Sequence, residues 1–146
     1  MSRSILILLA LFRISAAGAQ DLIGLNEPRI KVLMADERPA LIINDKVKND
    51  IYRYLKYTSG EEGETWLIFL DEKGICNGVR ITYEKSSIEE KRGELNRLHK
   101  SEGTDSWVYR SRGKLIDIDL KDENWFFTVT YKVAQHKDRS GDDRTA

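Results

Sequence analysis

Two aspartates that alternate along a predicted strand form the clearest acidic pair in the sequence. Asp117 and Asp119 lie in the run IDIDL, so both carboxylates project from one face, about 7 Å apart at the strand rise. Together with Asp122 and Glu123 they offer the oxygen ligands that calcium prefers. No calcium-binding loop surrounds them, and alternating aspartates are typical of the solvent-facing side of a strand. We therefore predict no metal site and keep Asp117 and Asp119 as the ligand candidates of an alternative.

The residues that serve acid–base and nucleophilic catalysis are few and poorly placed. A glycosidase needs paired carboxylates in a cleft that raises one pKa, which a wet strand does not provide. Cys76 is the only cysteine, and its apolar neighbours predict a small, partly buried side chain without a disulfide partner. The two histidines, His99 and His136, lie at a predicted helix end and in a polar tail. The sequence therefore predicts no catalytic residue and no cofactor.

The tyrosines are the best binding candidates in the chain. Tyr52 and Tyr54 fall on the same face of a predicted strand over 51–58. If Tyr109 shares that face, the three rings form an exposed aromatic patch of the kind that marks binding surfaces. The alternative is ordinary cross-strand pairing of aromatic side chains. Exposed aromatic faces also stack on sugars, which leaves a glycan or another small ligand as a further alternative.

The first residues have the physical parts of a secretory signal. A short basic start is followed by the eight-residue apolar run ILILLALF, and Ala17 and Ala19 stand where a signal peptidase requires small residues. We expect cleavage after Ala19; the alternative is a short N-terminal helix of a cytosolic protein. The run is too short to span a bilayer, which takes about 20 residues, and no later stretch suits a membrane helix. The mature protein is therefore expected in the periplasm or the medium.

The charge balance argues against a nucleic-acid partner. The chain has 24 basic and 24 acidic side chains, and cleavage after Ala19 would remove Arg3 and Arg13, leaving 22 basic against 24 acidic groups. Both signs are interspersed along the chain, whereas nucleic-acid binding needs a basic excess or a basic face. The composition instead predicts a mixed, solvated surface.

Two helices and six to seven strands must position these residues. One helix is predicted over 27–37, because Asn26 can cap it and the residue before Pro39 disfavours helix. The other covers 86–100, where Ser87 and the glutamate three residues later match a capping box. Alternation of apolar and β-branched residues predicts the strands 51–58, 65–71, 76–84, 107–111, 114–120 and 125–133, with a short edge strand at 40–43. The segment 101–105 is predicted to be a loop.

The last of these strands, WFFTVTYKV, carries the strongest signal. Its alternate apolar residues predict a strand that is packed on one face and wet on the other, as in an antiparallel sheet. A weaker echo, VRITYE at 79–84, lies 48 residues before TVTYK at 128–132. The echo favours a repeated supersecondary unit, with chance similarity as the alternative.

The expected fold is a single α+β domain over 20–135, followed by a disordered polar tail over 136–146. It has an antiparallel sheet of six to seven strands, two helices on one face and the order α-β-β-β-α-β-β-β. Gly24, Leu25 and Asn26, leading into IKVL at 30–33 and then hairpins, resemble the secreted β-lactamase-inhibitor-like family. The small outer-membrane assembly lipoproteins share this helix-plus-meander unit, although this chain lacks their lipid-attachment cysteine. The layout also resembles small exported bacterial proteins of unassigned function. These resemblances imply binding or assembly rather than catalysis.

These observations predict a small exported, non-catalytic module that binds another protein or assists envelope assembly through its aromatic sheet face. Trp107 and Trp125 are the predicted core or near-core anchors. A metal-dependent hydrolase that uses Asp117 and Asp119 is one alternative. A carrier of a glycan or small ligand is another, and it would need a cavity between the helices and the sheet.

Overall fold

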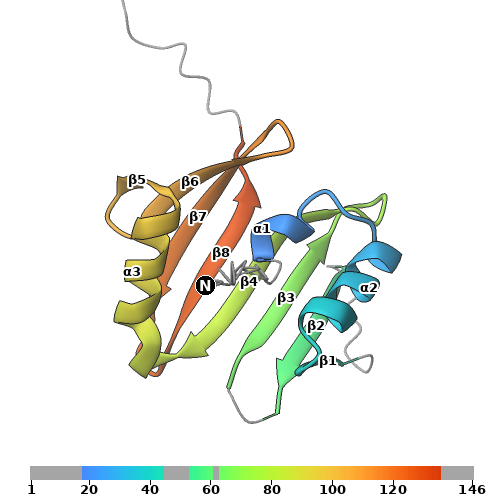
Figure 1. The fold of residues 1–146 in the computed structure, drawn as a ribbon, viewed down its shortest axis with the longest axis horizontal. Helices are drawn as coiled ribbons and strands as arrows, with labels where there is room; N and C mark the ends of the chain where they lie inside the picture. The colour runs from blue at the N-terminus through green and yellow to red at the C-terminus, as the bar shows by residue number, and fades with distance from the viewer. Residues whose placement is uncertain (1–17, 45–52, 61–62, 136–146) are drawn as a thin grey trace, which may run out of the picture.

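The computed structural model describes residues 18–44, 53–60 and 63–135, and over these the protein is α+β (Figure 1). An eight-stranded antiparallel sheet has the strand order β1-β2-β3-β4-β8-β7-β6-β5. The helical segments are α1 (Ala19–Leu22), α2 (Glu27–Glu37), the 3₁₀ turn η1 (Lys85–Ser87) and α3 (Ile88–Leu98). The strands are β1 (Leu41–Ile43), β2 (Tyr54–Ser59), β3 (Thr65–Leu70), β4 (Cys76–Glu84), β5 (Lys100–Gly103), β6 (Ser106–Ser111), β7 (Lys114–Asp122) and β8 (Phe126–Val133).

The described chain consists of two halves of the same layout, each an 11-residue helix followed by a four-stranded meander. The halves join where β4 pairs with β8 at the centre of the sheet. Ile81 lies opposite Val129 in that ladder, and these two residues are 48 positions apart, the spacing of the sequence echo. Two flanking pairs of the ladder, Val79–Tyr131 and Tyr83–Phe127, are related in the same way: adding 48 to the β4 residue of one pair gives the β8 residue of the other. The register therefore fits a local twofold axis at the Ile81–Val129 pair.

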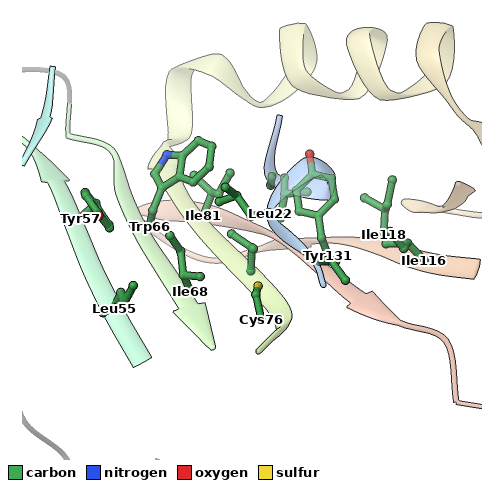
Figure 2. Packing of buried hydrophobic residues seen from close by; sticks show 14 of the residues in the cluster. Leu22, Leu55, Tyr57, Trp66, Ile68, Cys76, Ile81, Ile116, Ile118 and Tyr131 are labelled. Carbon is green, nitrogen blue, oxygen red and sulfur yellow. The ribbon is translucent and has the colours of Figure 1, made fainter. Parts of the chain in front are cut away.

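All of the large buried side chains of the sheet lie on one face. In β8, Phe127, Val129 and Tyr131 are buried, while the residues between them are partly or fully exposed. This confirms the alternation predicted for the strand. Figure 2 shows the same arrangement across the sheet, with the labelled side chains of several strands projecting from one face towards the helices. Burial of each such Val, Ile or Phe contributes about 1.5–3 kcal/mol.

The helices α1, α2 and α3 all contribute to this core. Leu22, Ile30, Met34 and Leu95 are buried in the same cluster as the inner face of the sheet. The predicted bounds of α2 are confirmed. Asn26 caps the start of this helix, since its side-chain oxygen accepts a hydrogen bond from the backbone N–H of Arg29 at 3.1 Å. The helices of the described residues therefore cover one sheet face, and none of them lies on the opposite face.

Two predictions about secondary structure were wrong, and the first of them changes the strand count. The strand β5 covers the end of the predicted helix and most of the predicted loop, and it pairs with β6, so the sheet has eight strands. The predicted capping box is also absent: Ser87 lies in η1, and its hydroxyl donates to the carbonyl of Glu84 at 3.0 Å. The helix begins at Ile88, and the element order after α1 is α-β-β-β-β-α-β-β-β-β.

The remaining domain predictions concern the ends of the chain. Residues 1–17 and the tail 136–146 lie outside the described residues, so the signal segment and the disordered tail stay predictions. Within the described residues, no helix has the length and apolar character needed to cross a membrane.

Candidate functional site

The sheet face opposite the helices, called the helix-free face below, is the candidate site. It carries the outward-pointing residues of each strand, which alternate with the buried ones. The register places aromatic and aliphatic side chains among polar ones there: Ile42, Tyr54, Leu67, Phe69, Val108, Leu115 and Phe126. No described helix packs on this face, so these side chains are partly or fully accessible.

A row of contacts crosses the centre of the helix-free face from β2 to β8. The rings of Tyr54 and Phe69 meet edge to face, with centroids 6.3 Å apart. The guanidinium carbon of Arg80 lies 6.0 Å from the centroid of Phe69. Arg80 Nε also donates a hydrogen bond to Thr130 Oγ1 at 3.3 Å, although Arg80 is exposed. Arg80 is therefore oriented by a ring on one side and a hydroxyl on the other, and its charge faces solvent.

The predicted aspartate pair lies farther along the same face. Asp117 is opposite Lys132 in the β7–β8 ladder, and Asp119 is opposite Thr130. Asp119 accepts a hydrogen bond from Ser106 Oγ at 2.8 Å. The two aspartates thus share one strand face, as predicted. Among the described residues, no three His, Cys, Asp or Glu side chains are grouped as a metal site.

The structure does not bring the predicted tyrosine patch together. Tyr54 lies on the helix-free face, whereas Tyr109 packs against the core and its ring lies 5.1 Å from that of His99. Side chains two positions apart on a strand share a face, and Tyr109 is two residues from the buried Trp107, so both point towards α3. The third member, Tyr52, lies outside the described residues.

The two predicted tryptophan anchors have opposite environments. Trp107 is 2% exposed, and its indole N–H donates to Asn96 Oδ1 at 2.9 Å, which confirms it as a core anchor. Trp125 is 88% exposed, so its assignment to the core was wrong. The chain turns before β8 begins, and the Glu123 N–H donates to the Phe126 carbonyl at 2.9 Å, so Trp125 lies in the turn rather than in the strand.

This turn is attached to the body of the domain. Lys85 Nζ donates to the carbonyl of Glu123 at 2.8 Å and forms an ion pair with Asp122. Phe126, the next residue after Trp125, is 41% exposed and lies on the helix-free face opposite Glu84. The turn therefore presents two neighbouring aromatic side chains at one end of that face.

The groups considered for nucleophilic catalysis lie on the other side of the sheet. Cys76 is buried, and burial raises the pKa of its thiol to about 11. Its thiol donates to the carbonyl of Gly78 at 3.5 Å. Burial lowers the pKa of His99, whose ring contacts Tyr109 rather than the cysteine. The thiol is therefore protonated near neutral pH and has no described base beside it.

Sequence reasoning missed two central residues of the face, Phe69 and Arg80. The run TWLIFLD is apolar at almost every position, so its pattern alone does not show that Phe69 faces away from the buried Trp66, Ile68 and Leu70. In VRITYE, alternation likewise places Arg80 on the face opposite to the buried Val79 and Ile81. Alternation of side chains along each strand places both residues on the same face, but predicting that this face is the outward one also requires knowing which face the helices cover.

Comparison with known proteins gives no further guide to this site. A scan against protein-family models, a search of curated proteins and a search of solved structures each found no match.

Proposed function

We propose that this chain is a small exported, non-catalytic module that binds another protein through the helix-free face of its sheet, in the periplasm or outside the cell. The observation that carries the proposal is the one-sided arrangement of the domain. The described helices pack on one sheet face, and the other carries Tyr54, Phe69 and Arg80 in a row from β2 to the central strand β4. Tyrosine and arginine are prominent among the residues that dominate binding energy in protein interfaces.

The dimensions of the face suit a protein partner. Eight strands at the usual spacing make a surface roughly 34 Å wide, which accommodates an interface of about 800 Å² per partner. Apolar side chains are interspersed with charged ones on this face, the composition typical of interfaces between separately folded proteins.

The metal-dependent hydrolase is a weaker alternative. It would rest on Asp117 and Asp119, and the described residues supply no third His, Cys, Asp or Glu to complete a metal site with them. Asp119 is also engaged by Ser106.

Export and a place in envelope assembly are further parts of the proposal. The basic start, apolar run and small residues before Gln20 support export. The layout of each half, one helix followed by a four-stranded meander, supports a resemblance to the β-lactamase-inhibitor-like family and to the envelope lipoproteins with that unit. Both resemblances rest on the order of the helices and strands.

The test compares two single tyrosine variants as baits for proteins of the producing cell's envelope and medium. Tyr54→Ala should lose the captured partner while its melting temperature changes little, because its ring lies on the exposed face. Tyr109→Ala is the matched control. It removes a ring from the core side and should lower the melting temperature but keep the partner when assayed well below melting.

Two results would contradict the proposal. One is a partner that the Tyr54→Ala variant retains as well as the wild type does. The other is a large loss of melting temperature in Tyr54→Ala, which would make that ring part of the core. If no protein is captured, a thermal-shift screen with sugars and small ligands would decide between a carrier and the module proposed here.

A further inference from the structure

Arg80 occupies the middle of the helix-free face in a conformation that leaves its charge available. It lies on β4, one of the two central strands, and its Nε is used by Thr130 while Phe69 lies beside the guanidinium. Among the described residues, neither Arg80 nor Lys132, which lies diagonally across the β4–β8 ladder from it, forms an ion pair. An oriented guanidinium is suited to bidentate binding of a carboxylate.

The helix-free face has a basic excess that the chain as a whole lacks. Its register positions hold six basic residues, Lys56, Arg80, Lys100, Arg110, Lys121 and Lys132, and three acidic ones, Glu84, Asp117 and Asp119. The full chain has equal numbers of both signs. Of the ion pairs among described residues, only Lys121–Glu123 uses a base of this face. The face therefore complements an acidic partner surface.

A partly exposed aromatic ring, Phe69, lies next to these charges. Gly78 is directly opposite both Phe69 and Lys132 in the two ladders. Gly78 is itself buried, and a Cβ there would lie 3.3 Å from the Tyr131 carbonyl oxygen and 3.9 Å from both Phe69 Cδ2 and Lys132 Cβ, so its neighbours already cover the glycine. The Phe69 ring is only partly buried, and its exposed part is available to an apolar side chain of a partner.

We infer that the partner is a protein that presents a carboxylate beside an apolar side chain, with the carboxylate bound by Arg80 and Lys132 and the apolar group resting against the Phe69 ring. This inference rests on the proposed function, since it names the chemistry of the partner at the same face. Hot spots of this kind lie near the centre of interfaces and combine Arg with an aromatic neighbour.

The same face does not suit a polyphosphate chain. Asp117 lies opposite Lys132, and Glu84 and Asp119 lie on the same two central ladders. These carboxylates would repel a continuous track of phosphates, whereas a single carboxylate carries one charge and needs only Arg80 and Lys132 as partners. A protein surface with spaced acidic groups is thus favoured over nucleic acid.

The probe is a phage-displayed library of random peptides, selected on the full mature protein. Selected peptides should be enriched in Asp or Glu beside Trp, Phe or Leu. Synthetic copies should bind the Arg80→Gln/Lys132→Gln double variant at least about tenfold more weakly, and binding to the wild type should weaken as salt rises. Arg80→Lys should lose part of the affinity, because lysine keeps the charge without the planar fork.

A matched double variant controls for net charge. Lys73→Gln/Arg97→Gln removes the same charge from a turn and from α3, and it should bind the peptides as the wild type does. Unchanged melting temperatures show that the Arg80 and Lys132 changes do not act through unfolding.

The outcomes separate this inference from the proposed function. Neutral or basic selected peptides would overturn the inference, and so would acidic peptides that bind the Arg80→Gln/Lys132→Gln variant normally. Failure to enrich any peptide also counts against it. If neutral peptides nevertheless lose binding to Tyr54→Ala, the helix-free face remains a protein-binding surface and only the acidic partner is rejected.

Discussion

At the scale of single residues, Cys76 shows how position determines chemistry. It is the first residue of β4 and lies beside the segment that joins α1 to α2. Its backbone N–H donates to the Leu25 carbonyl, and its carbonyl accepts from the Gly24 N–H, both at 2.8 Å. Its side chain is 2% exposed. Burial without a nearby cation disfavours the thiolate, so this cysteine acts as a small apolar side chain.

We therefore expect Cys76 to resist alkylation in the folded protein. A pKa raised from 9.0 to about 11 leaves about a hundredfold less thiolate near neutral pH, and burial restricts access further. Iodoacetamide labelling followed by mass spectrometry should be at least a hundredfold slower in buffer than in concentrated urea. Equal rates in the two conditions would show an exposed, reactive thiol.

His99 makes the fold sensitive to mild acid. Its buried Nδ1 has no hydrogen-bond partner in the described structure, and burial lowers its pKa below the usual 6.5, although Glu94 acts in the opposite direction. The folded state therefore binds this proton less readily than the unfolded state does. Its contribution to stability is fully present above about pH 6.5 and is lost as the pH falls towards the lower folded pKa.

The expected result is a fall in melting temperature between pH 7.5 and pH 5.5 that is smaller in His99→Gln than in the wild type. Parallel melting curves in the two proteins would show that other groups control the acid sensitivity.

At the scale of elements, the β7–β8 turn is a rigid support for an exposed aromatic pair. Lys85 fixes the turn through Asp122 and the Glu123 carbonyl, so Trp125 is presented by an ordered element. The backbone beside Trp125 is thus already fixed, which reduces the conformational entropy that the turn would lose on binding. We regard the turn as a second contact at the end of the helix-free face.

Trp125→Ala should change the free energy of unfolding by less than about 0.5 kcal/mol, as expected for an exposed side chain. Trp107→Ala should cost about 3–5 kcal/mol, because it empties a buried site and leaves Asn96 without its donor. Urea unfolding of the two variants measures both values. Similar losses in both would contradict the assignment of Trp125 to the surface.

The elements with local signals were predictable and those defined by distant contacts were not. The bounds of α2 follow from Asn26 and Pro39, and the faces of β8 follow from strict alternation. The strand β5 has the sequence KSEG, which is exposed throughout and has no apolar pattern; only its pairing with β6 makes it a strand. The same limit applies to the site, because the faces of Tyr109 and Phe69 depend on where the helices pack.

At the scale of the whole molecule, the two halves make one continuous sheet. The β4–β8 ladder joins them through seven paired positions, and it places Arg80 of the first half beside Thr130 of the second. The central contact of the proposed binding face therefore exists only when both halves are present. The helices stabilise the sheet from the far side without covering this contact.

Site-specific photo-crosslinking in the producing cell tests the central claim most directly. A benzophenone amino acid is placed at Lys56 or Thr128 on the helix-free face, and at Lys31 or Arg97 on the exposed sides of α2 and α3 as matched controls. Irradiation joins each position to whatever protein contacts it.

We expect adducts with the same partner from Lys56 and Thr128 and none with that partner from Lys31 and Arg97. Adducts that form only from the two helix positions would show that the partner binds the opposite side of the molecule. Absence of adducts from all four positions would contradict a protein-binding role for the helix-free face.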